Sequence, residues 1–414
     1  MKRKTRSTLC VLLMLCMAFT LLTSFSSCAL HDKKAMIVIH GIAGGSLYDA
    51  KTNQPVYAIE SVTPEELGSL IPQLDTMINS LFLNDDGSQT VDLRPATMND
   101  KKGVFGMLNT MKPIYDTLQA NFGDEYDVIN WTYDWRLDND VNALELEKLV
   151  KKYDKIQLFA HSMGGNLVSR FLLKEENRKK VELFIPFSTP FLGSADTHYF
   201  FNECQFANMS SLFNGDIDGL NLDINKLFEK FGSVITNFLT QFRNVAATTY
   251  SAYQLTPCPL YYNDPFYDNT NQTVYSENGI YFNHTQIIEK MKTLPLCHTK
   301  DGNVRVALDT FDEFKAKEFV EVDGVLKHIS TLVNTHYFAG NNVPTLATYD
   351  LSDGVATADN YMFGDGLVSI WSGVAGTSVD AANVTLFDGA THLSILSNKN
   401  ALAKMVQIVK SVNA

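Results

Sequence analysis

The chain has 414 residues, of which 45% are hydrophobic and 19% are charged, and this composition excludes a disordered or collagen-like protein. Its 34 Lys+Arg and 46 Asp+Glu give a formal charge of -12. Four basic residues lie within the first six positions, and without residues 1–27 the balance is 30 Lys+Arg against 46 Asp+Glu, a charge of -16. An acidic body with no basic stripe argues against nucleic acid as a partner.

The first 28 residues predict an export signal that is separate from the folded body. Basic residues at positions 2–6 precede an apolar run, residues 9–22, that is too short for a comfortable transmembrane helix. Ser26-Ser27-Cys28 resembles the lipobox of bacterial lipoproteins, with Phe25 in the place where leucine is usual. We therefore predict lipidation of Cys28 and a membrane-anchored protein at the cell surface. The alternatives are ordinary cleavage nearby, which gives a secreted protein, and an uncleaved anchor.

Three cysteines remain in the body, at Cys204, Cys258 and Cys297. This odd number is compatible with one disulfide and one free thiol, and the sequence does not select the pair. No C-x-x-C pair or Cys/His cluster has the spacing of zinc ligands.

One segment resembles the start of a calcium-binding loop. Its oxygen-bearing residues precede a glycine, as in such loops, and they are Asn214, Asp216, Asp218 and Gly219. The final glutamate of the loop is replaced by Asn225, so a surface turn is the better interpretation. We expect neither a metal nor a cofactor.

Apolar runs alternate with segments of helical spacing along the body. Continuous apolar runs predict buried strands at residues 35–40, 127–131, 156–160, 181–187, 337–340 and 384–387. Helical spacing predicts helices at residues 140–153, after residue 162 and at residues 393–412. The alternation predicts an α/β fold, a mostly parallel sheet with helices on both faces. Without a repeat or a Pro/Gly-rich linker, residues 29–414 are expected to form one domain with insertions.

The most informative motif is Ala160-His161-Ser162-Met163-Gly164-Gly165. It follows a predicted buried strand and begins a predicted helix, which is the position of a nucleophile elbow. The sharp turn raises a serine hydroxyl above the sheet, and small neighbours are needed because other chain segments pass close by. Ser162 is therefore the predicted nucleophile.

A serine nucleophile needs a base and an acid that orients the base, and in this fold class they follow the serine in the order acid, then histidine. Asp365 lies in a glycine loop after a strand-like segment, and His392 lies between the last predicted strand and the last helix. We predict Asp365 as the acid and His392 as the base. Asp359 and Asp388 are the rival acids.

The oxyanion hole is expected to consist of two backbone N–H groups. One belongs to Met163, which follows the nucleophile at a helix N-terminus. The other lies in the glycine-rich loop after the first strand, where Ile42 is the first choice and Ala43 the second. This loop lacks the spacing of a dinucleotide-binding or P-loop motif.

Ser162 and Asp365 are 203 residues apart, more than a strand, a helix and a loop require. The excess, at about residues 195–332, is predicted to form a cap over the sheet. Within it, apolar residues form one wide helical stripe: Leu227, Phe228, Phe231, Val234, Ile235, Phe238, Leu239 and Phe242. Packing onto the core of the cap is the simpler interpretation, and a mobile lid or a lipid-binding face is the alternative.

Together these segments resemble the lecithin:cholesterol acyltransferase-like α/β hydrolases. The resemblance rests on ordered segments at residues 37–47, 131–137, 160–165, 188–194, 251–262, 337–345 and 364–369, and on the loop at His392. It implies the α/β-hydrolase fold with an inserted cap, and acyl transfer from a phospholipid or neutral lipid to water or to a lipid hydroxyl. Ser162, Asp365 and His392 match the triad of the family.

The most family-specific segment is Tyr-Asp-Trp-Arg, residues 133–136. By resemblance, Tyr133 and Trp135 are candidates to line the acyl site, whereas Asp134 and Arg136 are expected to form a structural ion pair. His40-Gly41 replaces the Pro-Gly of many members and has the usual lipase form, which leaves hydrolase and transferase both open.

We therefore expect an exported serine acyl hydrolase or O-acyltransferase that cleaves a lipid ester through an acyl-enzyme on Ser162. Its partners are then the lipid ester and a membrane or lipid interface. The alternatives are a serine amidase or peptidase on the same fold and a non-catalytic, lipid-binding surface lipoprotein.

Overall fold

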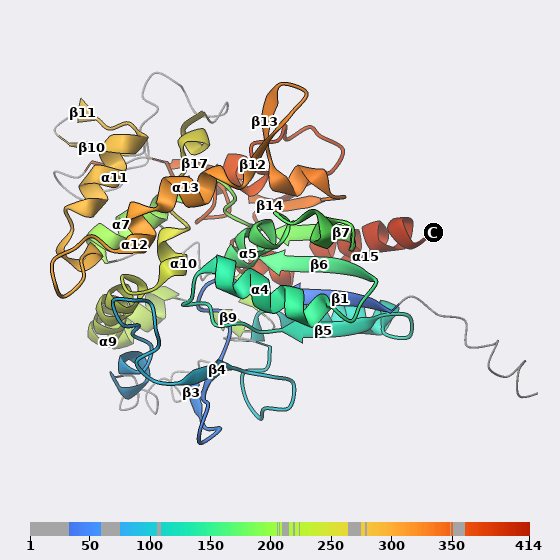
Figure 1. Ribbon diagram of the computed structural model, residues 1–414, viewed down its shortest axis with the longest axis horizontal. Coiled ribbons are helices and arrows are strands. Elements are labelled where there is room, and N and C mark those ends of the chain that lie inside the picture. The colour runs from blue at the N-terminus through green and yellow to red at the C-terminus, as the bar shows by residue number, and fades with distance from the viewer. Residues whose placement is uncertain are drawn as a thin grey trace, which may run out of the picture.

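A computed structural model (Figure 1) provides the structure. It describes residues 33–58, 75–105, 109–204, 206, 208, 215–217, 220–222, 224–263, 275–277, 280–347, 349–350 and 361–414. The predicted signal with Cys28 and the rival acid Asp359 lie outside these residues. In the part that the structure describes, no helix has the length and apolar character that crossing a membrane requires.

Six parallel strands form the central sheet, in the order β18-β14-β7-β6-β1-β5. They are β1 (Lys34–Ile39), β5 (Asp127–Trp131), β6 (Lys155–His161), β7 (Val181–Phe187), β14 (Tyr337–Asn341) and β18 (Val384–Asp388). Each of the six strands overlaps one of the six apolar runs that were predicted as buried strands. The expected α/β-hydrolase sheet is confirmed, because strands buried on both faces must be apolar along their length.

Helices cover both faces of the sheet, and the alternation of side chains along β1 shows how. Ala35, Ile37 and Ile39 belong to the same buried cluster as residues of α4 (Asn139–Val150) and α5 (Met163–Phe171). Met36 and Val38 point to the opposite face, where they join α3 (Lys112–Phe122) and α15 (Lys399–Asn413). Figure 1 shows α4 and α5 in front of the sheet.

The last helix begins later than its apolar spacing predicts. The prediction spans residues 393–412, whereas α15 begins at Lys399, after a short 3₁₀ turn at Ser394–Leu396. The side chain of Asn398 accepts the N–H groups of Asn400 and Ala401 and so caps the helix. Ile395 and Leu396 are buried in the turn, which makes the apolar pattern look continuous.

A long insertion separates β7 from β14, and Figure 1 shows most of its helices beyond the carboxyl ends of the strands. Its helices are α7 (Ala195–Glu203), α9 (Ile224–Ala246), α10 (Tyr250–Tyr253), α11 (His284–Lys292), α12 (Val306–Asp309) and α13 (Phe311–Ala316). Its strands are β8 (Gly215–Ile217), β9 (Leu220–Leu222), β10 (Tyr275–Glu277), β11 (Ile280–Tyr281), β12 (Phe319–Val322) and β13 (Val325–His328). Most of the residues in a second buried cluster come from this insertion. The predicted cap, at about residues 195–332, falls within the insertion, and its role as a cover of the sheet stays a prediction.

Buried charges connect the end of the insertion to the body of the fold. Arg170 of α5 donates to the Phe314 carbonyl at 2.8 Å. Lys315 donates to Glu318 at 2.9 Å and to the Phe191 carbonyl at 3.2 Å. Because all three charged side chains are buried, each needs these partners to offset the loss of water.

The apolar stripe of the predicted cap helix lies on α9. Of its eight residues, the structure describes the side chains of Phe238, Leu239 and Phe242. These three pack inward, and Phe238 and Phe242 contact both the sheet cluster and the insertion cluster. For this part of the stripe, packing onto the core is therefore the correct interpretation.

The three cysteines of the body are free thiols. Burial raises the pKa of Cys258 and raises that of Cys297 to about 11. The suspected calcium loop falls partly outside the described residues, with Asp216 in β8, which pairs antiparallel with β9. Among the described residues, no group of three or more metal-binding side chains could hold a metal ion.

Candidate active site

Ser162 occupies a strained turn between β6 and α5. Its backbone has φ 52° and ψ -131°, a conformation that residues other than glycine rarely adopt. Its N–H donates to the Phe187 carbonyl of β7 at 3.0 Å, which fixes the turn to the neighbouring strand. The strain is maintained by the surrounding sheet, as expected for a nucleophile elbow.

Two glycines after Ser162 allow other segments to approach. A Cβ on Gly164 would lie 2.4 Å from the His40 carbonyl oxygen, and one on Gly165 would lie 2.1 Å from Thr189 Oγ1. Both distances are too short for real contacts. The requirement for small residues in the motif therefore has a steric cause at each position.

The structure brings together the three residues predicted as a triad. Ser162 Oγ lies 3.0 Å from His392 Nε2, and His392 Nδ1 lies 2.9 Å from Asp365 Oδ2. All three side chains are buried, and Ser162 is only 5% exposed. This is a nucleophile, a base and an orienting acid within hydrogen-bond reach of one another.

Asp365 is held as a carboxylate. Its Oδ1 accepts the N–H groups of Leu367 at 2.9 Å and Val368 at 2.7 Å, while Oδ2 faces His392. Burial raises the pKa of Asp365, but the charge and hydrogen bond of His392 and these N–H donors outweigh burial and lower the pKa overall. The rival Asp388 lies at the end of β18, where it accepts the amide groups of Asn341 and Asn342.

The strand-like segment expected before Asp365 is β17 (Tyr361–Gly364), and it pairs with β15 (Val343–Leu346), a strand that was not predicted from the sequence. The two strands pair antiparallel beyond the end of β14. Thr345 of β15 accepts the N–H of Gly366 at 2.9 Å, and Val343 forms a bridge with Asp365 itself. These short strands therefore place the acid.

The loop after β1 has a fixed backbone next to Ser162. The Gly41 carbonyl accepts the Nδ1–H of His40 at 2.8 Å and the N–H of Gly44 at 3.1 Å. A peptide group is planar and trans, so the Ile42 N–H, which shares this plane, points away from those two donors. The choice of Ile42 over Ala43 as an oxyanion donor stays a prediction. Met163 supplies the first N–H of α5, which has no partner within its own helix.

Burial keeps His40 neutral by lowering its pKa to about 4. Its ring stacks on Tyr133 with centroids 4.2 Å apart, and its Nε2 accepts the Tyr133 N–H at 3.3 Å. His40 is therefore part of the loop's support, in agreement with the sequence analysis, which did not select it as a base.

Tyr133 and Trp135 direct their polar atoms at the same loop. The Tyr133 hydroxyl donates to the His40 carbonyl at 2.9 Å, and Trp135 Nε1 donates to the Gly45 carbonyl at 3.1 Å. Both side chains are buried. They support the loop that carries Ile42, and their role in lining an acyl site stays a prediction.

Asp134 and Arg136 form a buried, two-pronged ion pair. Arg136 Nε lies 2.9 Å from Asp134 Oδ1 and Nη2 lies 2.7 Å from Oδ2. The same guanidinium donates to the Leu81 carbonyl and to Gln89, so it also fixes the segment before β4 (Leu93–Pro95). Every nitrogen of the guanidinium has a partner.

Replacing Arg136 with leucine is expected to lower the free energy of unfolding by about 3–5 kcal/mol, because it leaves Asp134 charged and buried. Urea denaturation checks this. The double variant Asp134→Asn with Arg136→Leu removes the isolated charge, and it should recover part of the loss. A single variant as stable as the wild type would contradict the structural role.

Gly41 lies against the nucleophile, and a side chain there should impair catalysis. A Cβ on Gly41 would lie 2.7 Å from Ser162 Cβ and 3.2 Å from Oγ. Gly41→Ala should therefore displace the hydroxyl and lower kcat for an ester about 100-fold. Gly232→Ala is the matched control, since a Cβ there meets nothing within 4 Å. Equal kcat in the two variants would show that the loop can move aside.

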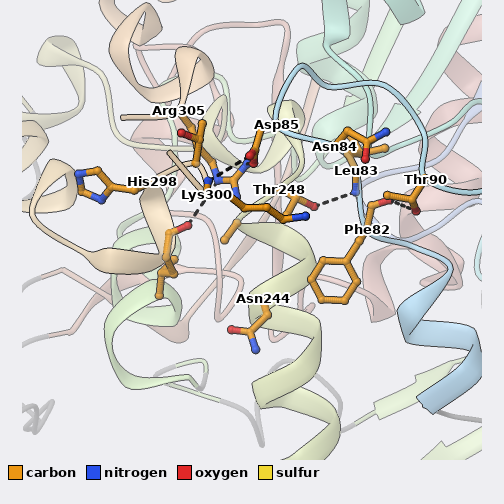
Figure 2. A pocket seen from close by; sticks show the side chains of 13 residues that line it. Phe82, Leu83, Asn84, Asp85, Thr90, Asn244, Thr248, His298, Lys300 and Arg305 are labelled. Carbon is orange, nitrogen blue, oxygen red and sulfur yellow. Dashed lines mark hydrogen bonds and ion pairs between the residues drawn. The ribbon is translucent and has the colours of Figure 1, made fainter. Parts of the chain in front are cut away.

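A second feature is a cavity of about 430 Å³, and Figure 2 shows side chains that line it. It lies between residues 82–90, the end of α9 and residues 296–305, and none of the triad residues lines it. On its wall Asp85 accepts the backbone N–H of Lys300 at 3.0 Å and pairs with Arg305 at 3.2 Å. None of these residues was among the predicted site residues.

A family model and one solved structure agree with this architecture. The model of the lecithin:cholesterol acyltransferase family matches residues 109–366. The chain is similar to a chain of the Tle4–Tli4 complex, at 11% identity over 92% of this chain and 99% of that chain, with a TM-score of 0.57. It is also aligned with the mature Bacillus licheniformis lipase BlEst2, at 12% identity over 92% of each chain, with a TM-score of 0.30. No curated protein matches it.

Proposed function

Because the chain belongs to the lecithin:cholesterol acyltransferase family, we propose that it cleaves a carboxylic ester of a lipid as a serine acyl hydrolase or O-acyltransferase. The substrate class is a phospholipid or an acylglycerol. The observation that carries the proposal is the continuous hydrogen-bonded path from Ser162 through His392 to Asp365, with spacings of 3.0 and 2.9 Å, on a strained elbow. Family membership supports the class of reaction, and the path supports its residues.

In the first half of the reaction, Ser162 Oγ attacks the ester carbonyl carbon and its proton passes to His392 Nε2. The negative charge of Asp365 stabilises the imidazolium and holds its Nδ1–H. The Ile42 and Met163 N–H groups bind the oxyanion. When the intermediate collapses, the carbon–oxygen bond to the leaving alcohol breaks and His392 returns its proton to that alcohol.

In the second half, the acyl group leaves Ser162. Water or an acceptor alcohol gives its proton to His392 and attacks the acyl carbon, and the proton then returns to Ser162 Oγ. The product is a fatty acid when water attacks and a new ester when an alcohol attacks. This chemistry uses only side chains and backbone N–H groups of the chain, without a cofactor.

The location is also part of the proposal. The basic residues at positions 2–6, the apolar run and Cys28 support export and anchoring by lipid at Cys28. An acidic body with a charge of -16 would then meet lipid through the anchor and apolar surface rather than through general electrostatic attraction. The mass of the mature N-terminus tests this, because an unmodified residue after ordinary cleavage would rule out lipidation.

The test of the reaction is incubation of purified protein with mixed phospholipids, triacylglycerol and an acceptor alcohol, followed by mass spectrometry of the products. Free fatty acid identifies a hydrolase, and a new ester of the acceptor identifies a transferase. A fluorophosphonate probe, run in parallel, should modify Ser162. Amide cleavage without ester cleavage would favour a peptidase, and no product with no labelling would favour a binding protein.

A further inference from the structure

We propose that His161, the residue before the nucleophile, is a positioning residue for the base His392. The structure places its Nε2 atom 2.9 Å from the backbone carbonyl oxygen of His392, 231 positions along the chain. A carbonyl can only accept, so Nε2 carries the proton and donates it. The inference rests on the proposed function, because it assigns a role in the same reaction.

The His161 contact completes the fixation of His392. The His392 N–H donates to the Asp365 carbonyl at 2.9 Å, and its Nδ1 meets the Asp365 carboxylate at 2.9 Å. Both of these anchors belong to Asp365 and therefore move together with the loop after β17. His161 instead belongs to β6, directly beside Ser162, so its bond ties the backbone of the base to the strand that carries the nucleophile.

The ring of His161 also packs against the ring of His392. Their centroids are 4.8 Å apart with a tilt of 49° between the planes, and His161 is only 5% exposed. A buried histidine with only a packing role also needs a hydrogen-bond partner, but any nearby backbone carbonyl could be that partner. Here the partner is the backbone of the base itself, and the ring forms one side of the space that the base occupies.

His161 can keep this role throughout the reaction because it stays neutral. Burial and the neighbouring His392 lower the pKa of His161 to about 3, against smaller opposing effects that include Asp365. His40, the other titratable group that affects it, is also neutral. When His392 takes the proton from Ser162, the ring beside it therefore adds no second positive charge.

The geometry that His161 protects is the 3.0 Å separation between His392 Nε2 and Ser162 Oγ. Without the bond to its carbonyl, the peptide after His392 can rotate, and rotation there shifts the imidazole relative to the hydroxyl. A displacement of about 1 Å in a reacting group can cost about 100-fold in rate. The loss should appear in kcat, because the contact does not involve the substrate.

Three variants of the full-length protein separate this role from general packing. His161→Gln keeps an amide N–H at about the position of Nε2. His161→Asn keeps an amide, but its shorter side chain does not reach the His392 carbonyl. His161→Met fills the volume of the ring without a hydrogen-bond donor. His336→Met makes the same chemical change at a half-buried histidine away from the triad. For each protein, kcat and KM are measured on a chromogenic carboxylic ester, and thermal unfolding is recorded.

We expect His161→Asn and His161→Met to lower kcat about 10- to 100-fold with KM changed less than about threefold. His161→Gln should recover most of that loss, and His336→Met should match the wild type. Wild-type kcat in His161→Met or His161→Asn would overturn the inference, as would equal losses in all three His161 variants that follow unfolding temperature. If the wild type neither turns over esters nor reacts with a fluorophosphonate, the proposed function fails and this inference fails with it.

Discussion

Replacing Ser162 with alanine is expected to lower kcat for ester turnover by about 10⁶-fold. The reason is that Ser162 Oγ is the only nucleophile in hydrogen-bond contact with His392 Nε2 in the described part of the chain. The substitution removes one buried oxygen atom. The backbone turn keeps its hydrogen bond from the N–H of residue 162 to the Phe187 carbonyl. The folded state should therefore survive the change.

Product release from a phospholipid or acylglycerol, followed by mass spectrometry, measures the effect. Circular dichroism and the unfolding temperature serve as the control for folding. Loss of fluorophosphonate labelling should accompany the loss of turnover. A folded Ser162→Ala protein that retains activity would show that another residue attacks the ester, and the assignment of the elbow would be wrong.

The second large effect is expected for Asp365→Asn, which should lower kcat by about 10⁴-fold. The local hydrogen bonds show why. Oδ1 already accepts two backbone N–H groups, so the asparagine oxygen will occupy that place and its NH₂ group will face His392 Nδ1. His392 Nδ1 must then accept a hydrogen bond from this NH₂ group, so the ring proton of His392 moves to Nε2. A histidine in this tautomer cannot take the proton of Ser162.

Asp388→Asn is the matched control, since it makes the same chemical change at the rival acid. Asp388 is exposed and contacts the amides of Asn341 and Asn342 at the end of the sheet. We expect its kcat to stay within about twofold of the wild type, as is usual for exposed sites away from the chemistry. A larger loss in Asp388→Asn than in Asp365→Asn would transfer the role of acid to Asp388.

The sheet could be predicted from the sequence because burial on both faces requires continuous apolar strands. The predicted bounds of β5 and β7 coincide with the observed ones, and those of β1 and β6 differ by one residue at each end. The positions of Ser162 and His392 could also be predicted, since each of these residues follows a predicted buried strand. The start of α15 could not, because Ile395 and Leu396 continue its apolar pattern through a turn.

The supports of the site could not be predicted, because they join residues that are distant in sequence. Tyr133 reaches the carbonyl of His40 across 93 positions, and Trp135 reaches that of Gly45 across 90. Their spacing carries no local signature of that role. For a related reason β15 was missed, and β17 was marked only as a strand-like segment without bounds. Each has four residues, and Pro344 in β15 and Phe363 in β17 are exposed, so neither has the pattern of a buried strand.

These two strands also have a consequence for how the chain tolerates change. Asp365 is reached by a return strand whose register is set by pairing of Val343 with Gly364 and by the Thr345 hydroxyl. The length of the connection at residues 347–360 therefore does not determine where the carboxylate lies. Insertions or deletions in this connection are therefore expected to leave the acid in place. The return strand thus separates the position of the acid from the length of the chain that leads to it.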